Sequence, residues 1–209
     1  MQITWLGHSC FKISHNGFTI VIDPYQPGTV PGLKELNVEA DMVLCSHSHF
    51  DHGFTDAVKI VSSGTANPFS IEKIHTYHDD VSGAKRGENI VHILEADGIR
   101  VAHFGDLGCP LTPEQVAKLG ALDAAMMPVG GFFTLDAVQA KEELAKLDPK
   151  VIIPMHYRSA HFGFKEIGEL SAFTGLFDPA LVKKYDGDTI DITKASPKQI
   201  AILKPTNQQ

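Results

Sequence analysis

The stretch "CSHSHFDHGF", residues 45–54, brings three histidines and an aspartate together within six positions: His47, His49, Asp51 and His52. Protonated histidines this close would repel one another, whereas neutral imidazoles arranged around a cation would not. His47 and His49 are two residues apart, so an extended backbone points both side chains to one side, where they can hold one ion together. Asp51 and His52 follow after a change of direction and would face a second position. Because zinc favours nitrogen and carboxylate ligands, the stretch predicts a metal site.

Polar residues also end several runs that have the composition of β-strands. In layered α/β proteins, functional sites gather where strand ends lead into loops. If these ends point to one edge, their side chains would converge on the metal site. With the first stretch, three of them would complete seven ligands for two ions and leave room for a shared hydroxide. The strand-ending residues are Asp23 in "IVID", His47 in "VLCSH", His78 in "KIHTYH", Asp106 in "VAHFGD" and His156 in "VIIPMH".

Short β-branched and aromatic runs predict the strands. Three runs within residues 2–23 read as a meander, because Asn16-Gly17 between the last two is a strong hairpin signal. Residues 24–40 hold three prolines and two glycines and are expected to form a loop. Residues 89–106 read as a hairpin that turns at Asp97-Gly98. At the C-terminal end, "DTIDI" and "QIAIL" are expected to form a terminal strand pair.

Three segments predict helices. Thr112, Pro113 and Gln115 form the capping-box start of the first, which Gly120 closes. The run "TLDAVQAKEELAKL" has the spacing of an amphipathic helix, and a last helix is expected around "FKEIGELSAF". Strands form meanders first and then alternate with helices, so we expect one α/β domain over residues 1–209, built from two sheets with helices outside.

Composition narrows the function classes and partners. The net charge of −7, without a cluster of basic residues, disfavours nucleic acid as a partner. No apolar run reaches the length needed to span a bilayer, so no membrane partner is expected. The N-terminus lacks the charged start and apolar core of a signal peptide, and the three cysteines are few and far apart in the sequence, so we expect a cytoplasmic protein. A small-molecule substrate is the expected partner, and a homo-oligomer is compatible with the sequence.

His47-Ser-His49-Phe-Asp51-His52 matches the H-x-H-x-D-H signature of the metallo-β-lactamase fold hydrolases. The segments "WLGHSCFKI", "VIDPY", "HFGDLG", "PVGG" and "PMHY" resemble the branch that includes ascorbate-6-phosphate lactonase-like and N-acyl-phosphatidylethanolamine phospholipase D-like proteins. Within that branch, the chain is similar to small bacterial and archaeal members called metal-dependent hydrolases. The resemblance covers nearly the whole chain and implies an αββα four-layer sandwich with two divalent ions, usually Zn²⁺, with Mn²⁺ or Fe²⁺ as alternatives.

The resemblance also implies how the ligands divide between the two ions. His75 competes with His78, but His78 is preferred because "HDD" opens the loop after the strand, whereas His75 lies within it. Asp106 would bridge the ions. The first ion would take His47, His49 and His78, and the second would take Asp51, His52 and His156.

Other residues are candidates for supporting roles. Asp23 either forms a turn before Pro24 or accepts a hydrogen bond that orients a ligand histidine. His8 either lines the pocket or caps its strand. Arg86 either holds an anionic substrate group or anchors its own loop. Two further residues are expected near the pocket: Tyr157, beside His156, and His161, a surface residue close enough to contact substrate.

Two divalent ions lower the pKa of a bridging water and present hydroxide at neutral pH. Asp51 is the expected catalytic residue, orienting this nucleophile or carrying a proton. The sequence therefore predicts a hydrolase of an ester, lactone or phosphodiester in a small, anionic substrate. The alternatives are an iron-dependent oxidoreductase and a non-catalytic metal-binding module on the same fold.

Overall fold

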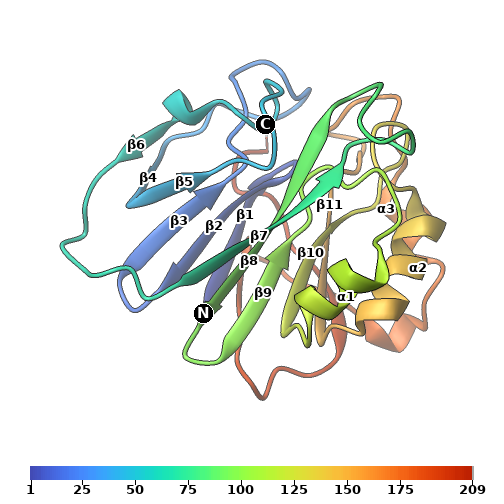
Figure 1. The fold of residues 1–209 in the computed structure, drawn as a ribbon. Helices are drawn as coiled ribbons and strands as arrows, with labels where there is room; N and C mark the ends of the chain where they lie inside the picture. Colours follow the sequence, from blue (N-terminus) through green and yellow to red (C-terminus); the bar gives the residue numbers. More distant parts are fainter. Residues whose placement is uncertain (209) are drawn as a thin grey trace.

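The computed structural model describes residues 1–208 and contains two mixed β-sheets (Figure 1). One cluster of buried apolar side chains within the described residues includes members of both sheets, among them Trp5, Phe11, Leu94 and Ile153. The first sheet has five strands in the order β13 (Thr189–Asp191), β1 (Gln2–Gly7), β2 (Cys10–His15), β3 (Phe18–Ile22) and β5 (Met42–Leu44).

The second sheet has seven strands, and a separate ribbon has two. The order in the second sheet is β12 (Val182–Lys184), β14 (Gln199–Ile202), β11 (Val151–Met155), β10 (Ala124–Pro128), β9 (Ile99–His103), β8 (Glu88–Ala96) and β7 (Ser70–Tyr77). The ribbon pairs β4 (Val38–Ala40) with β6 (Val58–Ile60), and the 3₁₀ turn η1 (Thr55–Ala57) precedes β6.

The helices and the five-stranded sheet lie on opposite sides of the seven-stranded sheet (Figure 1). The helices are α1 (Pro113–Leu119), α2 (Ala137–Leu147) and α3 (Leu170–Thr174), and a second 3₁₀ turn, η2, spans Pro179–Leu181. The expected sandwich of sheets and helices is therefore confirmed. None of the helices in the described part of the chain is long and apolar enough to cross a membrane.

The two hairpin turns and the helix start that the sequence predicts are confirmed. Asn16 and Gly17 both have positive φ between β2 and β3, as do Asp97 and Gly98 between β8 and β9. These are the conformations that a two-residue hairpin with the right-handed twist of its strands requires. The capping box of α1 also forms: Thr112 accepts a hydrogen bond from the backbone of Gln115, whose side chain accepts one from Thr112 N.

Three expectations about elements need correction, two of them only in part. Residues 164–169 are not helical, and α3 begins only at Leu170, because Gly168 N donates to Gly130 O and Gly168 O accepts from Arg158 N. The expected terminal strand pair does not form: β13 pairs with β1 and β14 pairs with β11, so the two strands belong to different sheets. The segment expected to be a loop, residues 24–40, is irregular up to residue 37 but ends in β4, which pairs with β6 on the far side of the site stretch.

Strand direction brings the ends of strands from both sheets to the same region. β1 and β3 both run antiparallel to β2, and β5 runs parallel to β3, so the C-terminal ends of these three strands share one edge. β7 and β9 both run antiparallel to β8, and β9, β10 and β11 run parallel to one another. The residues that follow these strands are therefore presented together, as the sequence predicts.

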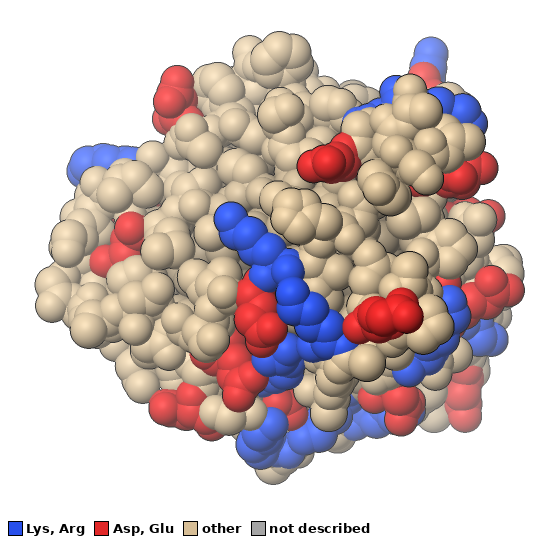
Figure 2. All heavy atoms as spheres, in the orientation of Figure 1, with Lys and Arg blue, Asp and Glu red and all other residues tan. Residues whose placement is uncertain are grey.

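Figure 2 shows a diagonal run of lysine and arginine side chains near the centre of one face, with aspartates and glutamates beside it. Arg100 contacts both Glu72 at 3.0 Å and Glu95 at 2.7 Å.

Candidate metal centre

The seven predicted ligands meet at the shared edge of the two sheets. His47, His49 and His78 form one group whose ligand atoms all lie within 4.8 Å of one another. Asp51, His52 and His156 belong to a second group, which also contains His8. The structure therefore brings these side chains into the two sets that the sequence predicts, and adds one residue.

Asp106 lies between the two groups. Its Oδ2 is 3.2 Å from His78 Nε2, on the first side, and 3.4 Å from His156 Nε2, on the second. Its Oδ1 is 3.2 Å from His52 Nε2. A buried carboxylate with both oxygens facing ligand nitrogens has the position that a bridging ligand requires.

Two sets of distances within the centre differ in length. The contacts of Asp106 to His52, His78 and His156 are 3.2–3.4 Å long. The bonds that hold the rings from behind are shorter, such as 2.8 Å from His52 Nδ1 to Asp23 Oδ2. Two ligand atoms that lie about 2.0–2.1 Å from a tetrahedral ion are about 3.3–3.4 Å apart. The longer contacts therefore have the spacing of atoms around an ion, which is also the long end of the range for hydrogen bonds.

Several of these atoms are buried without a hydrogen-bond partner in residues 1–208: His47 Nε2, His52 Nε2, Asp106 Oδ1 and both ring nitrogens of His156. Leaving a buried polar atom unpaired costs about 1–3 kcal/mol. Several such atoms that face one point fit a cation, because coordination would satisfy them together. The residues present therefore fit two divalent ions.

Asp23 fixes one ligand of each group through hydrogen bonds on the side of the ring that faces away from the centre. Its Oδ2 accepts from His52 Nδ1 at 2.8 Å and from Ser46 Oγ at 2.6 Å, and its Oδ1 accepts from Ser46 N at 2.6 Å. Ser46 Oγ in turn lies 2.9 Å from His47 Nδ1. With Ser46 donating to Asp23, this oxygen accepts from His47. Both rings then carry their proton on Nδ1 and present the lone pair of Nε2 to the centre. Ser46 was not singled out from the sequence, although it directly precedes the first ligand.

In the centre, burial and neighbouring charges shift the pKa values of the acids and histidines in opposite directions. Burial alone would raise the pKa of Asp23, but His52 and His103 bring it to about 2. Burial would lower the pKa of His52, yet the carboxylates of Asp106, Asp51 and Asp23 hold it well above its usual range, so an ion that binds Nε2 would displace a proton from it. Burial, with His52 nearby, lowers the pKa of His47 to about 3. A neutral His47 is the form that binds a metal.

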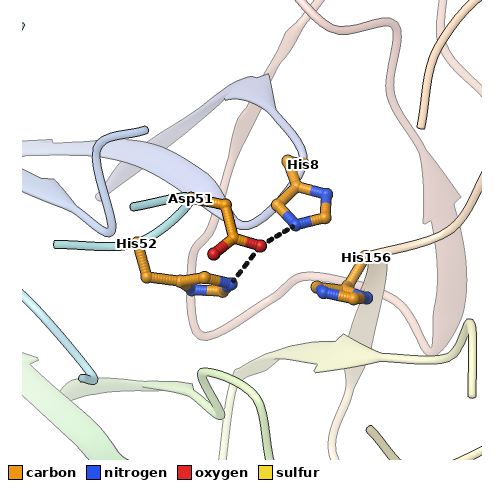
Figure 3. A group of neighbouring side chains, drawn as sticks. All are labelled: His8, Asp51, His52 and His156. Carbon is orange, nitrogen blue, oxygen red and sulfur yellow. Dashed lines mark hydrogen bonds and ion pairs between the residues drawn. The ribbon is translucent and has the colours of Figure 1, made fainter. Parts of the chain in front are cut away.

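Asp51 belongs to the second group and is partly exposed. Its Oδ2 is 3.7 Å from His52 Nε2 and 3.3 Å from His8 Nε2, and the residue is only partly buried (Figure 3). Burial would raise the pKa of the Asp51 carboxyl, but His52 and His8 hold it below its usual range. Asp51 is therefore a carboxylate that faces both the metal centre and the adjoining pocket.

The structure distinguishes between His78 and His75 as the candidate ligand. His75 lies within β7, opposite Ile90, and its side chain is exposed. His78 follows the end of β7, is buried, and reaches Asp106. The geometry favours His78, as expected from its place at the strand end.

Three residues of the centre adopt the left-handed backbone conformation that non-glycine residues rarely use. His8, Asp23 and His156 each have φ of 53° directly after β1, β3 and β11. Backbone strain of this kind costs about 1–3 kcal/mol per residue and concentrates at functional sites. Here it turns each side chain out of its strand direction toward the centre.

A cavity of about 410 Å³ opens beside the ligands. Arg86 lies at its side, where Nη2 donates to Phe132 O at 3.1 Å and the guanidinium carbon lies 5.7 Å from the Phe133 ring centre. Asp79 anchors the loop that carries Arg86, accepting backbone hydrogen bonds from four residues: Val81, Gly83, Lys85 and Arg86. The residues that line the cavity are Thr29, Ser48, His49, Phe50, Asp51, His78, Arg86, Asp106, Phe133 and Phe164.

Two candidates from the sequence do not reach this cavity. Tyr157 is buried, and its ring packs 5.5 Å from Trp5 and 5.8 Å from Phe162. His161 is exposed, and both residues line a different cavity, of about 430 Å³. Because successive residues leaving a strand point to opposite sides, the neighbour of His156 faces the core.

Known proteins resemble this chain over most of its length. The model of the beta-lactamase superfamily domain matches residues 2–156. A UPF0173 metal-dependent hydrolase of Hyperthermus butylicus is 26% identical over 97% of this chain and 96% of its own. Another, from Pelotomaculum thermopropionicum, is 30% identical over 76% of this chain and 85% of its own.

A solved structure extends the likeness to three dimensions. A Thermotoga maritima chain assigned as a Zn-dependent hydrolase of the metallo-β-lactamase superfamily is 33% identical, with a TM-score of 0.73 and 97% of each chain covered. The fold, the ligand arrangement and these matches agree: the chain belongs to the metallo-β-lactamase superfamily, among its metal-dependent hydrolases.

Proposed function

We propose that the protein holds two divalent ions and hydrolyses an ester, lactone or phosphodiester bond in a small, anionic substrate. The observation that carries this proposal is the pair of ligand groups meeting at Asp106, with buried ring nitrogens that lack hydrogen-bond partners in residues 1–208. One ion would take His47, His49 and His78, and the other would take Asp51, His52 and His156. Asp106 would contact both.

Two ions held there would lower the pKa of a water molecule between them and polarise the bond to be cut. The chain's own residues supply the rest. Asp23 and Ser46 hold His47 and His52 in the tautomer that frees Nε2. Asp51, at the boundary of centre and cavity, can orient the attacking water and accept its proton.

The lining of the cavity supports an anionic substrate with an apolar part. Arg86 is the cationic side chain among the lining residues, and its contact with Phe132 O leaves other guanidinium donors to face a carboxylate or phosphate. Phe50, Phe133 and Phe164 offer apolar surface beside it and limit the access of water to the reacting bond.

Zn²⁺ is the proposed metal because the centre is rich in imidazole, which suits zinc, although imidazole also suits iron. We also propose a cytoplasmic location. Cys10, Cys45 and Cys109 are all free thiols, which supports a reducing compartment.

The test combines metal analysis with a panel of substrates. Purified protein reconstituted with Zn²⁺ should bind two ions per chain by elemental analysis, and should hydrolyse at least one class among aryl phosphodiesters, lactones and carboxylate esters. Arg86→Gln should raise KM for the anionic members about tenfold or more while leaving metal content unchanged, since one charge-assisted contact contributes about 1.5–3 kcal/mol.

The matched control is Lys85→Gln, which removes the same charge from an exposed neighbour on the same loop. It should leave KM near that of the wild type. A protein that takes up no metal, or that hydrolyses none of the panel with both ions bound, would contradict the proposed function. Equal KM changes in the two variants would contradict the role of Arg86 alone.

A further inference from the structure

His8 is a histidine that the usual division of the ligands leaves unused, yet it lies in the second group. It follows Gly7 at a break in the β1–β2 register and is buried. Its carbonyl oxygen accepts from Trp5 Nε1 at 2.9 Å and from His156 N at 3.4 Å. These bonds, together with its left-handed φ, lock the residue in one conformation.

The His8 ring points toward the same space as the other members of the group (Figure 3). A ligand atom of His8 lies within 4.8 Å of the ligand atoms of Asp51, His52 and His156. The ring centre of His8 is 4.1 Å from that of His156 and 5.5 Å from that of His52. Four side chains from three separate segments of the chain thus converge.

Two roles are compatible with this position: a hydrogen bond to Asp51, or a bond to the ion. His8 Nε2 is 3.3 Å from Asp51 Oδ2. That distance is longer than the 2.8 Å and 2.9 Å bonds that hold His52 and His47 from behind. It is the spacing of the Asp106 contacts and of two ligands on one ion, about 3.3–3.4 Å. The same oxygen of Asp51 also faces His52 Nε2, so it lies between two imidazoles rather than pairing with one.

We propose that His8 is a fourth protein ligand of the second ion, in addition to Asp51, His52 and His156; this rests on the proposed dinuclear centre. The second ion then has three nitrogens and one carboxylate of its own, as well as Asp106. The first ion has three imidazoles, and one of them, His49, is exposed. The second ion is therefore held more tightly, and a chelator removes the first ion before it.

The direct test is NMR on protein labelled with ¹⁵N-histidine and loaded with two equivalents of ¹¹³Cd²⁺. The ¹⁵N signal of His8 Nε2 should be split by ¹¹³Cd, as should those of His52 and His156. The His8→Asn variant serves to assign the signal, because asparagine tolerates the left-handed backbone but cannot extend an imidazole into the centre. An unsplit His8 signal beside split His52 and His156 signals overturns the proposal and leaves a hydrogen bond to Asp51 as its role.

A second measurement is competition for Zn²⁺ with a chromophoric chelator. His8→Asn should weaken the second ion about a hundredfold or more, beyond the roughly 10–100-fold typical of losing an outer hydrogen-bond partner. His161→Asn, which removes an exposed histidine from a different cavity, should keep the wild-type affinities.

Metal uptake distinguishes failure of the dinuclear centre from failure of the proposed role of His8. Wild-type protein that takes up fewer than two ions contradicts the dinuclear centre, and His8 loses its partner with it. Wild-type protein that takes up two ions, with His8→Asn binding both equally well, contradicts the role of His8 alone. The melting temperature of metal-free His8→Asn should match that of the metal-free wild type, which separates lost coordination from misfolding.

Discussion

Replacing Asp23 by asparagine tests whether one buried carboxylate sets the tautomers of ligands in both groups. In the wild type, Asp23 accepts from His52 Nδ1 at 2.8 Å and from Ser46 Oγ at 2.6 Å. The asparagine side chain is nearly isosteric, but one of its ends carries an NH₂ donor. Facing Ser46, that donor meets another donor. Facing His52, it moves the ring proton to Nε2, which then cannot bind a cation.

The structure indicates how the loss divides between the ions. The second ion is affected directly through His52, and losing such an outer partner typically weakens metal binding about 10–100-fold, or about 1.4–2.7 kcal/mol. The first ion is affected through Ser46 and His47, one hydrogen bond further away. We expect its affinity to fall by less than about tenfold.

The assay is competition for Zn²⁺ with a chromophoric chelator at pH 7.5, on wild type and Asp23→Asn. The matched control is Asp123→Asn, because Asp123 is also buried and also accepts three hydrogen bonds, from Arg100 N, Lys150 Nζ and Lys194 Nζ. The control should melt at a lower temperature but bind both ions like the wild type. Wild-type affinity for both ions in Asp23→Asn would refute the reasoning.

Three further predictions concern the ligands themselves. Removing the ions with a chelator should lower the melting temperature by about 5–10 °C for each site held at a free metal concentration near 100 Kd, because such binding stabilises the folded state by about 2.7 kcal/mol; an unchanged calorimetric scan would argue against a bound ion. Asp51→Ala should lose the second ion and about a hundredfold or more of kcat while keeping the first ion, as checked by elemental analysis and kinetics. His78→Ala should sharply weaken the first ion, whereas His75→Ala should keep near-normal metal occupancy, since His75 is exposed within β7; the reverse result would move the ligand to His75.

The sequence alone determines the features that depend on neighbours along the chain. The turns at Asn16-Gly17 and Asp97-Gly98 follow from residues that tolerate positive φ, and α1 follows from its capping box. These are local effects, so no partner from elsewhere in the chain is needed to predict them.

Other features depend on which distant segments meet, and only the tertiary structure decides them. β13 and β14 are both short strands near the C-terminal end, yet each pairs with a strand of a different sheet, because pairing depends on the edges left open by the rest of the fold. Residues 164–169 contain helix-forming residues but form a turn, in which Ile167 N donates to Phe164 O, and Gly168 bonds to Gly130 and Arg158 instead of continuing a helix.

Within the metal centre, too, the residues of one local stretch can be predicted from the sequence directly, whereas those from distant segments are placed by the tertiary structure. The stretch at residues 45–54 predicts metal chemistry by itself, because its residue types and spacing are those of metal ligands. The carboxylate that fixes its tautomers, and the histidine that joins its second group, come from the ends of β3 and β1. Their left-handed backbone and the direction of the strands place Asp23 and His8 there, while Tyr157, next to a predicted ligand, faces the core. Proximity in sequence identifies candidates, but strand direction and backbone conformation decide which side chains enter the centre.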